Sequence, residues 1–274
     1  MKVLLTGHSG FIGQNLLNEL LKKKVNLYIT KNKNLNIPKN KSIKIINLKK
    51  TFFLNQFDLV IHAAWGELNN YNSKKHMNKI LSENLKFLKR VVLSGAKNIV
   101  VLGTCFELGN CQGEVDEFEK MNPTTLYGKS KKSLLSKLLL LQQKFIFNLT
   151  WVRIFYVYGE NQKNKSLFSQ LIESNKNKTK QSFFELTSGN QKRDYLDVKT
   201  LSKKIILIAF LRKNLGIINV CSGKPISVKK LVFMWKKKFK WSIKFKFGVK
   251  KLKNYEPNNF WGSTKKMKYV LKKT

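Results

Sequence analysis

Thr104, Tyr127 and Lys131 are the residues of this sequence whose types and spacing suit proton transfer at a carbon–oxygen bond. Tyr127 and Lys131 are four residues apart, which places both side chains on one face of a helix. A free tyrosine has a pKa of about 10, and a neighbouring ammonium group favours its phenolate form. The hydroxyl of Thr104 suits a hydrogen bond to a substrate carbonyl or alcohol beside Tyr127. The three side chains predict acid–base chemistry.

A glycine-rich segment, TGHSGFIG, separates the first apolar run of the chain from its first helical pattern. Glycines at such a place let the backbone turn tightly and bring its N–H groups to a pyrophosphate at the positive end of the helix dipole. Between a strand and a helix, this pattern predicts a dinucleotide-binding turn. The residues expected to contact the cofactor here are Gly7, Ser9, Gly10, Phe11, Ile12 and Gly13.

The residues at the end of the second apolar run bear on the choice between NAD and NADP. An acidic side chain there accepts a hydrogen bond from the ribose 2′-OH of NAD, whereas a cationic side chain accommodates the 2′-phosphate of NADP. The segment reads Thr30-Lys31-Asn32-Lys33, without a carboxylate, which favours NADP over NAD. A charged nicotinamide would add to the effect of Lys131 on Tyr127, and Lys131 would also hold the ribose hydroxyls. We assign no proton-transfer role to His62. Four further positions are expected to contact the adenine and ribose: Asn47, Leu48, Ala63 and Ala64.

Short apolar runs alternate with helical patterns through the first half of the chain, which is typical of a parallel α/β sheet. Strands are expected at 2–7, 25–30, 42–48, 57–64, 98–104 and 149–159, and helices at 11–21, 82–95 and 131–145. These elements predict a Rossmann-type, doubly wound parallel sheet with a smaller C-terminal substrate-binding lobe. We expect residues 1–160 to bind NAD(P), with core elements returning near 194–222, and residues 161–274 to form mainly the substrate lobe.

The segments together resemble the extended short-chain dehydrogenases, also called the NAD-dependent epimerase/dehydratase family, over nearly the whole chain, and TGHSGFIG and YGKSK match its two signatures. The resemblance implies that Thr104 is a hydroxyl partner, Tyr127 the general acid/base and Lys131 its modulator. It places Phe155 and Val157 beside the nicotinamide and implies a sugar-nucleotide substrate whose phosphates Arg193 holds. The residues expected on the substrate side are Thr104, Cys105, Phe106, Tyr156, Arg193 and Trp261.

Differences from the family pattern narrow the range of reactions expected of this chain. Sugar-nucleotide 4,6-dehydratases carry an Asp-Glu pair after the catalytic Thr, where this chain has Cys105 and Phe106. The remaining likeness is to 4-ketoreductases of deoxysugar and surface-polysaccharide pathways, which implies NAD(P)H-dependent reduction of a nucleotide-linked 4-keto-6-deoxyhexose. A 4-epimerase with tightly bound NAD is the alternative enzyme, although Tyr156 replaces the Asn that is usual in that family.

The net charge of +39 over 274 residues would ordinarily indicate a polyanionic partner such as nucleic acid. However, arginine occurs at four positions only, whereas lysine is spread along the chain together with abundant Asn, Ile and Phe. Nucleic-acid readers favour Arg for bidentate contacts. We therefore interpret the lysines as a solvated surface, and keep a non-catalytic cofactor-sensing or nucleic-acid-binding relative as the alternative of another class.

Sequence features that the chain lacks bear on its location and on metal binding, and one helix bears on its assembly. No apolar stretch reaches the roughly 18 residues of a membrane helix, and the N-terminal run has no signal-peptide pattern. Three cysteines without a CxxC spacing argue against disulfides and against a zinc site. We expect a soluble, cytoplasmic protein with no metal. The helix at 131–145 is apolar on more than one side, which indicates a homodimer through it.

Overall fold

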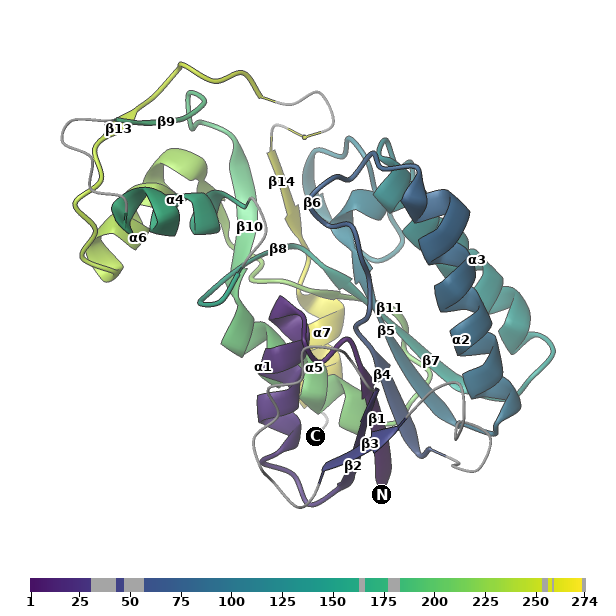
Figure 1. Cartoon of the computed structure of the whole chain (residues 1–274). Coiled ribbons are helices and arrows are strands. Elements are labelled where there is room, and N and C mark those ends of the chain that lie inside the picture. Colours follow the sequence, from purple (N-terminus) through teal and green to yellow (C-terminus); the bar gives the residue numbers. More distant parts are fainter. Residues whose placement is uncertain are drawn as a thin grey trace.

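Seven parallel strands form the central sheet of the computed structural model (Figure 1). Their order is β11-β7-β5-β4-β1-β2-β3. The chain winds outward from β1 in one direction through β2 and β3, and from β4 in the other, so the order reverses between β1 and β4. Such a switch point is where open α/β sheets bind ligands. The strands are β1 (Lys2–Thr6), β2 (Asn26–Thr30), β3 (Ile43–Ile46), β4 (Leu59–His62), β5 (Asn98–Thr104), β7 (Asn148–Ile154) and β11 (Gly216–Val220).

The Rossmann-type fold predicted from the sequence is confirmed by this sheet. The structure describes residues 1–30, 43–46, 57–162, 166–176, 183–252, 256–257 and 259–272. Three of the positions expected to contact the cofactor lie outside the described residues: Lys31, Asn47 and Leu48.

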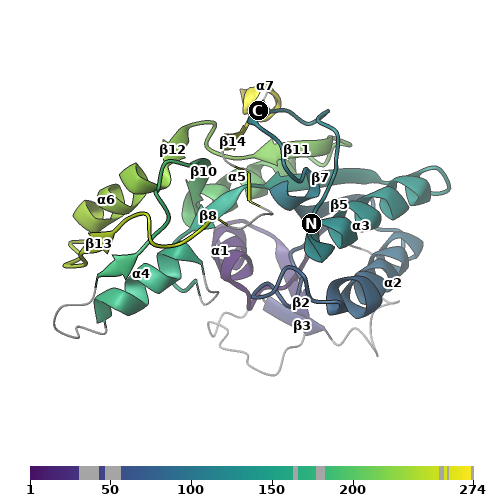
Figure 2. The same cartoon turned by 90° about the horizontal axis from the view of Figure 1, so that it is seen from above.

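Helices cover both faces of the large sheet, as Figures 1 and 2 show. On one face, α1 (Phe11–Leu20), α5 (Val198–Phe210) and α7 (Lys265–Lys272) bury apolar side chains against the strands. On the other face, α2 (Leu81–Leu93) and α3 (Leu126–Gln142) lie side by side over a second apolar cluster. A π-helical turn, His76–Ile80, leads into α2. The sheet is thus covered on both faces, and its carboxyl edge is left to form a site.

The apolar run expected as one strand at 149–159 is two strands in the structure. β7 ends at Ile154 in the large sheet, and β8 (Tyr156–Tyr158) pairs instead with β10 (Lys192–Asp197). The residues on both sides of Phe155 are mainly apolar or aromatic, so the sequence pattern does not reveal that the pairing partner of the chain changes there. Because of this change, Tyr156 and Val157 lie at the carboxyl edge of the large sheet.

A smaller lobe carries its own aromatic core. It contains α4 (Leu167–Lys176), α6 (Val228–Lys238) and the strand pair β9 (Phe184–Glu185) with β13 (Phe245–Lys246). The Phe168 ring lies 4.9 Å from Trp235, both of them buried. A second sheet in the order β12-β10-β14-β6 adjoins this lobe, with β12 (Pro225–Ser227), β14 (Asn259–Gly262) and β6 (Gly113–Val115).

Among the residues that the structure describes, we found no helix with the length and apolar character needed to cross a membrane.

Candidate active site

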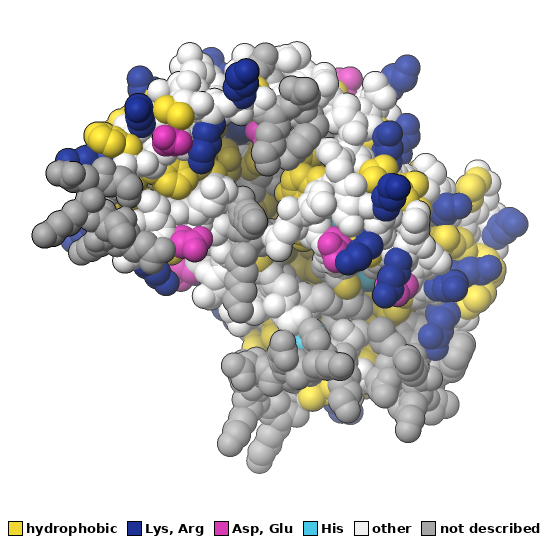
Figure 3. Space-filling model, turned by 45° about the horizontal axis from the view of Figure 1, so that its top comes forward, with side chains coloured by type: hydrophobic (Ala, Val, Ile, Leu, Met, Phe, Trp, Pro, Cys, Tyr) yellow, Lys and Arg dark blue, Asp and Glu magenta, His cyan; other side chains and the backbone are white. Residues whose placement is uncertain are grey.

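A cavity of about 1100 Å³ lies where the carboxyl ends of the parallel strands face the smaller lobe. Its lining comes from the turn between β1 and α1, from the segments that follow β4 and β5, from β8, and from the smaller lobe. The space-filling view shows hydrophobic side chains in the hollow between the two parts of the molecule (Figure 3). The cavity therefore occupies the switch point of the sheet, where a ligand is expected.

The glycine turn is built for close backbone approach. Gly7 has φ +72°, and a Cβ on it would lie 2.6 Å from the backbone of Ala63. Gly10 N–H donates to the carbonyl of Gly7 at 3.0 Å, and a Cβ on Gly13 would overlap that same carbonyl oxygen. The start of α1 is thus held against the end of β1, and the residues of its first turn line the cavity. This arrangement fits the pyrophosphate of a dinucleotide.

Most residues predicted to contact the cofactor come together at the cavity. Two do not line it: Gly7 and Ala64 pack against each other beneath the turn, where they support its shape. The predicted residues that do line the cavity are Ser9, Gly10, Phe11, Ile12, Gly13, Ala63, Tyr127, Lys131, Phe155 and Val157.

His62 is a structural residue. Its Nδ1 hydrogen-bonds Thr6 Oγ1 at 2.8 Å, and its Nε2 hydrogen-bonds Asn84 Oδ1 at 2.6 Å. Burial lowers the pKa of His62 to about 3, with the positive charge of Lys131 adding to the effect. The imidazole is neutral near pH 7 and joins β1, β4 and α2 at the edge of the site.

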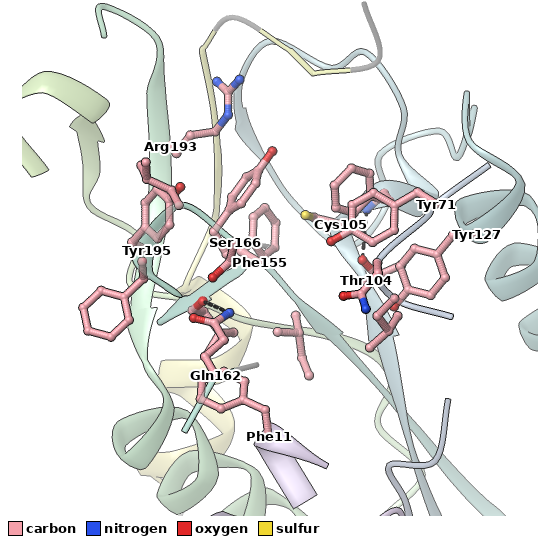
Figure 4. A pocket seen from close by; sticks show the side chains of 18 of the residues that line it. Phe11, Tyr71, Thr104, Cys105, Tyr127, Phe155, Gln162, Ser166, Arg193 and Tyr195 are labelled. Atoms are coloured by element: carbon pink, nitrogen blue, oxygen red, sulfur yellow. Dashed lines mark hydrogen bonds between the residues drawn. The ribbon is translucent and has the colours of Figure 1, made fainter. Parts of the chain in front are cut away.

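The three predicted catalytic residues all line the cavity. Figure 4 shows Thr104 and Tyr127 near each other in its wall. Thr104 is the last residue of β5, and Tyr127 lies in the first turn of α3, where Thr125 caps the helix by accepting from Gly128 N–H at 3.1 Å. The Tyr127 backbone N–H donates to the carbonyl of Tyr71 at 2.8 Å. The Tyr127 hydroxyl lies close enough to the Thr104 side chain for this neighbour to lower the pKa of the phenol. The two hydroxyls can therefore hold one substrate oxygen between them.

The expected effect of Lys131 on Tyr127 is not what this arrangement produces. Burial raises the pKa of Tyr127, with the Tyr71 hydroxyl adding to the rise and the Thr104 side chain opposing it. Lys131 Nζ instead donates to the carbonyl of Leu102 at 2.7 Å and lies 3.9 Å from the centre of the Trp65 ring. Desolvation dominates both groups: it lowers the pKa of Lys131 to about 7 and keeps Tyr127 a neutral phenol.

The part of the cavity predicted to bind the substrate has aromatic rings near Tyr127 and the Arg193–Glu256 ion pair beside Tyr156. The Phe106 ring lies 4.6 Å from Tyr71 and 6.3 Å from Tyr156. The Arg193 guanidinium lies over Tyr156 and 3.7 Å from the carboxylate of Glu256. The predicted substrate residues at the cavity are Thr104, Cys105, Phe106, Tyr156 and Arg193.

Trp261 is a correction to the predicted substrate set, because it does not line this cavity. It lies half-buried on β14, where the backbone pairs with Glu114 of β6. Glu256, three residues before β14, lines the cavity instead. The pairing of β14 with β6 and β10 sets which of these side chains reaches the site, and that long-range pairing is not visible in the local sequence.

Several residues of the site have no counterpart in the sequence predictions. Trp65 and Tyr71 follow the end of β4, a place where ligands of parallel sheets collect, so the strand prediction contained a signal for them. Glu107 follows Thr104 at the spacing of a capping box, another readable signal. Gln162 and Tyr195 also line the cavity, and no local sequence pattern marks either of them.

A model of the NAD dependent epimerase/dehydratase family matches residues 3–221. The chain belongs to this family. The resemblance drawn from TGHSGFIG and YGKSK is confirmed, and the protein is an enzyme of the NAD-dependent oxidoreductase type.

Individual relatives agree with this placement. The chain is 29% identical over 279 residues to a dTDP-6-deoxy-L-talose 4-dehydrogenase (NAD(+)) of Aggregatibacter actinomycetemcomitans, covering 96% of this chain and 100% of the relative. It is 25% identical to a dTDP-4-dehydro-6-deoxyglucose reductase of Escherichia coli, covering 84% and 79%. The solved UDP-glucuronic acid 4-epimerase of Bacillus cereus, in complex with UDP-glucuronic acid and NAD, has a TM-score of 0.83 at 21% identity, covering 100% and 94%. That likeness concerns the fold.

Proposed function

We propose that this protein reduces the 4-keto group of a nucleotide-activated 4-keto-6-deoxyhexose with NAD(P)H. The observation that carries the proposal is the set of side chains around Tyr127 in the cavity. Thr104 and the neutral Tyr127 phenol lie together there, and Cys105 and Phe106 occupy the two positions where sugar-nucleotide 4,6-dehydratases carry an Asp-Glu pair. Burial raises the pKa of the Cys105 thiol to about 12, so it is a poor acid–base group near neutrality. Proton transfer is therefore assigned to Tyr127.

The reaction follows from these positions. Reduced nicotinamide supplies a hydride when it is bound. Thr104 and Tyr127 both donate to the ketone oxygen and polarise the C4 carbonyl, and Tyr127 passes its proton to that oxygen as the C–H bond forms. The products are the C4 alcohol and the Tyr127 phenolate, whose charge the ammonium form of Lys131 stabilises until solvent returns the proton. Arg193 lies at the far side of the cavity, suited to the phosphates of the substrate.

The relatives support the sugar class. Two of them, at 29% and 25% identity, are named for reactions at C4 of dTDP-linked 6-deoxyhexoses. A hexose of this class presents a C6 methyl group, and the rings of Phe106, Tyr71 and Tyr156 offer it an apolar surface. We therefore expect dTDP-4-keto-6-deoxyhexoses to be the first substrates to turn over.

The cofactor preference is a separate proposal. The lack of a carboxylate after β2 favours NADP, whereas the Aggregatibacter relative is named for NAD+. We expect NADPH to be used at lower concentration than NADH, because a lysine-rich segment tolerates the 2′-phosphate.

The assay that tests the proposal follows the reduced-nicotinamide absorbance with NADPH and NADH separately. Enzymatically generated dTDP-, GDP- and CDP-linked 4-keto-6-deoxyhexoses are supplied in turn. We expect one cofactor molecule to be oxidised for each ketone reduced. Interconversion of sugar nucleotides without net cofactor oxidation would instead identify a 4-epimerase. No turnover, together with RNA binding that persists at moderate salt, would favour the nucleic-acid-binding alternative.

We propose that residues 1–160, with the core elements near 194–222, bind the cofactor and that residues 161–274 mainly bind the sugar nucleotide. Among the described residues, Lys and Arg side chains lie on both sides of the hollow in the face shown in Figure 3. We keep the interpretation of the lysines as a solvated surface rather than a nucleic-acid site.

We also propose a homodimer through α3. Apolar side chains remain exposed on α3 and on neighbouring segments, with Leu140 57% exposed. The others are Leu93, Leu139 and Ile146. A second copy would cover them. Sedimentation should give a dimer for the native protein and a folded monomer for Leu140→Glu. A native protein that sediments as a monomer at tens of micromolar would contradict the proposal.

A further inference from the structure

Glu107 is a fully buried carboxylate behind the catalytic residues, and the reaction proposed above does not use it. It lies at the end of a short 3-10 turn (Cys105–Glu107) that follows β5 directly. Its Oε1 accepts from the backbone N–H of Thr104 at 2.8 Å, while the Thr104 side chain accepts from Phe106 N–H at 3.3 Å. The carboxylate thus fixes the backbone of the residue that holds the substrate oxygen.

The same carboxylate joins β5 to β7. Trp151 Nε1–H donates to both of its oxygens, at 3.0 and 3.1 Å, and Arg153 Nε lies 3.4 Å from Oε2. Arg153 is also fully buried. A Cβ on Gly103 would collide with the Trp151 indole and lie 2.8 Å from Glu107 Oε1, so only glycine fits there. An ion pair at this depth is costly to desolvate and is weak evidence for a stabilising role.

The charge of Glu107 reaches the groups that move protons. Burial raises the pKa of Glu107, and Arg153 is the main opposing influence. At Lys131, burial lowers the pKa and Glu107 opposes that fall; at Tyr127, Glu107 adds to the rise caused by burial. Tyr71 and Cys105 are further titratable groups that raise the pKa of Tyr127. His62 and His76 are titratable groups near Lys131, whose positive charge lowers their pKa values.

We propose that Glu107 and Arg153 form a positioning pair that holds Thr104 in place and balances the charge around Tyr127 and Lys131. Neither Glu107 nor Arg153 lines the cavity. The pair therefore acts indirectly, through the hydrogen bond to the Thr104 backbone and through the electrostatic field of its charges. The inference rests on the proposed function, in which Tyr127 gives up a proton. It also gives a reason for keeping an ion pair where an apolar pair would pack as well.

Two substitutions separate the two roles. Glu107→Gln keeps an oxygen for the Thr104 and Trp151 N–H groups but leaves the Arg153 charge unbalanced. We expect the high-pH limb of the kcat/KM profile for reduction to move down by about half a pH unit or more, because an added positive charge lowers the pKa values of both Tyr127 and Lys131. Glu107→Asp keeps the charge and shortens the side chain, so kcat should fall about 10-fold without movement of the limb or of the dissociation constant for NADPH.

A charge-neutral double variant completes the test. Glu107→Gln with Arg153→Met removes both charges, and the limb should return to within about 0.2 pH units of wild type. Thermal unfolding of each variant corrects the rates for folded fraction. An unmoved limb in folded Glu107→Gln, or a moved limb in Glu107→Asp, would overturn the electrostatic role. Wild-type kcat in Glu107→Asp would overturn the positioning role, and this holds even if Glu107→Gln does not fold.

Failure of the proposed function is distinguishable from failure of this inference. With NAD+ bound and no sugar present, phenolate absorbance is titrated as the difference between each protein and its Tyr127→Phe counterpart. The midpoint should fall in the Glu107→Gln background and return in the double variant. If no sugar is reduced but these midpoints move as stated, the pair is supported and the sugar assignment is wrong. Midpoints that do not move contradict the pair.

Discussion

Tyr127→Phe should lower kcat for reduction of the 4-keto sugar by about 10³-fold, within the range that general acid catalysis contributes. The variant lacks the hydroxyl that lies beside the Thr104 side chain and is assigned to proton transfer. Its ring can still stack on Tyr71, whose centre lies 5.3 Å away, so the wall of the cavity is kept. The measurement is single-turnover oxidation of the reduced cofactor with the ketone substrate in excess.

The dissociation constant of the cofactor should change little in Tyr127→Phe, which separates lost chemistry from lost binding. Tyr28→Phe is the matched control, because Tyr28 is a buried tyrosine of β2 that packs on Phe57, away from the cavity. Its kcat should equal that of the wild type. If Tyr127→Phe kept more than about a tenth of wild-type kcat, another group would have to donate the proton, and the assignment of Tyr127 would be wrong.

Lys131→Met should lower activity by about 10²-fold and yet stabilise the protein at pH 6 by about 1 to 2 kcal/mol. Burial lowers the pKa of Lys131 from 10.5 to about 7 in the folded state. Below pH 7 the folded chain therefore carries a buried charge, and methionine removes this cost at similar volume. Loss of the hydrogen bond to the Leu102 carbonyl and of the contact with Trp65 offsets part of the gain.

The gain should depend on pH in a defined direction. Between pH 7 and 10.5 the unfolded chain holds a proton on Lys131 that the folded chain has lost, so wild-type stability rises with pH in this window. Lys131→Met lacks that rise, so its advantage should shrink steadily and vanish near pH 10. Urea unfolding of cofactor-free protein at pH 6, 7.5 and 9 measures the difference.

Lys129→Met serves as the control for that series. Lys129 is an exposed residue of the same helix, so its replacement removes a lysine without removing a buried charge. It should give no stabilisation that varies with pH. A Lys131→Met protein less stable than wild type at pH 6, or a difference that stays constant with pH, would show that the Lys131 charge is not costly in the folded state.

The site and much of the fold could be read from local sequence where the chemistry is itself local. A glycine turn needs glycines at set spacings, as at Gly7 and Gly13, and a Tyr–Lys pair on one helix face needs residues four apart. Alternation of apolar runs with helical periods predicted the parallel sheet, because burial on both faces leaves continuous apolar strands. The sequence by itself therefore determined the dinucleotide turn, the Tyr127–Lys131 helix and the class of fold.

Only the tertiary structure decided the features that depend on which distant segments meet. The run at 149–159 divides at Phe155 because β8 pairs with β10, and Trp261 lies off the cavity because β14 pairs with β6. The neutral state of Tyr127 and the lowered pKa of Lys131 arise from burial, which spacing along a helix does not measure. Glu107 meets Arg153 across 46 residues of chain. Strand pairing and desolvation are long-range quantities, and they set the electrostatics of a site whose residues local patterns had already marked.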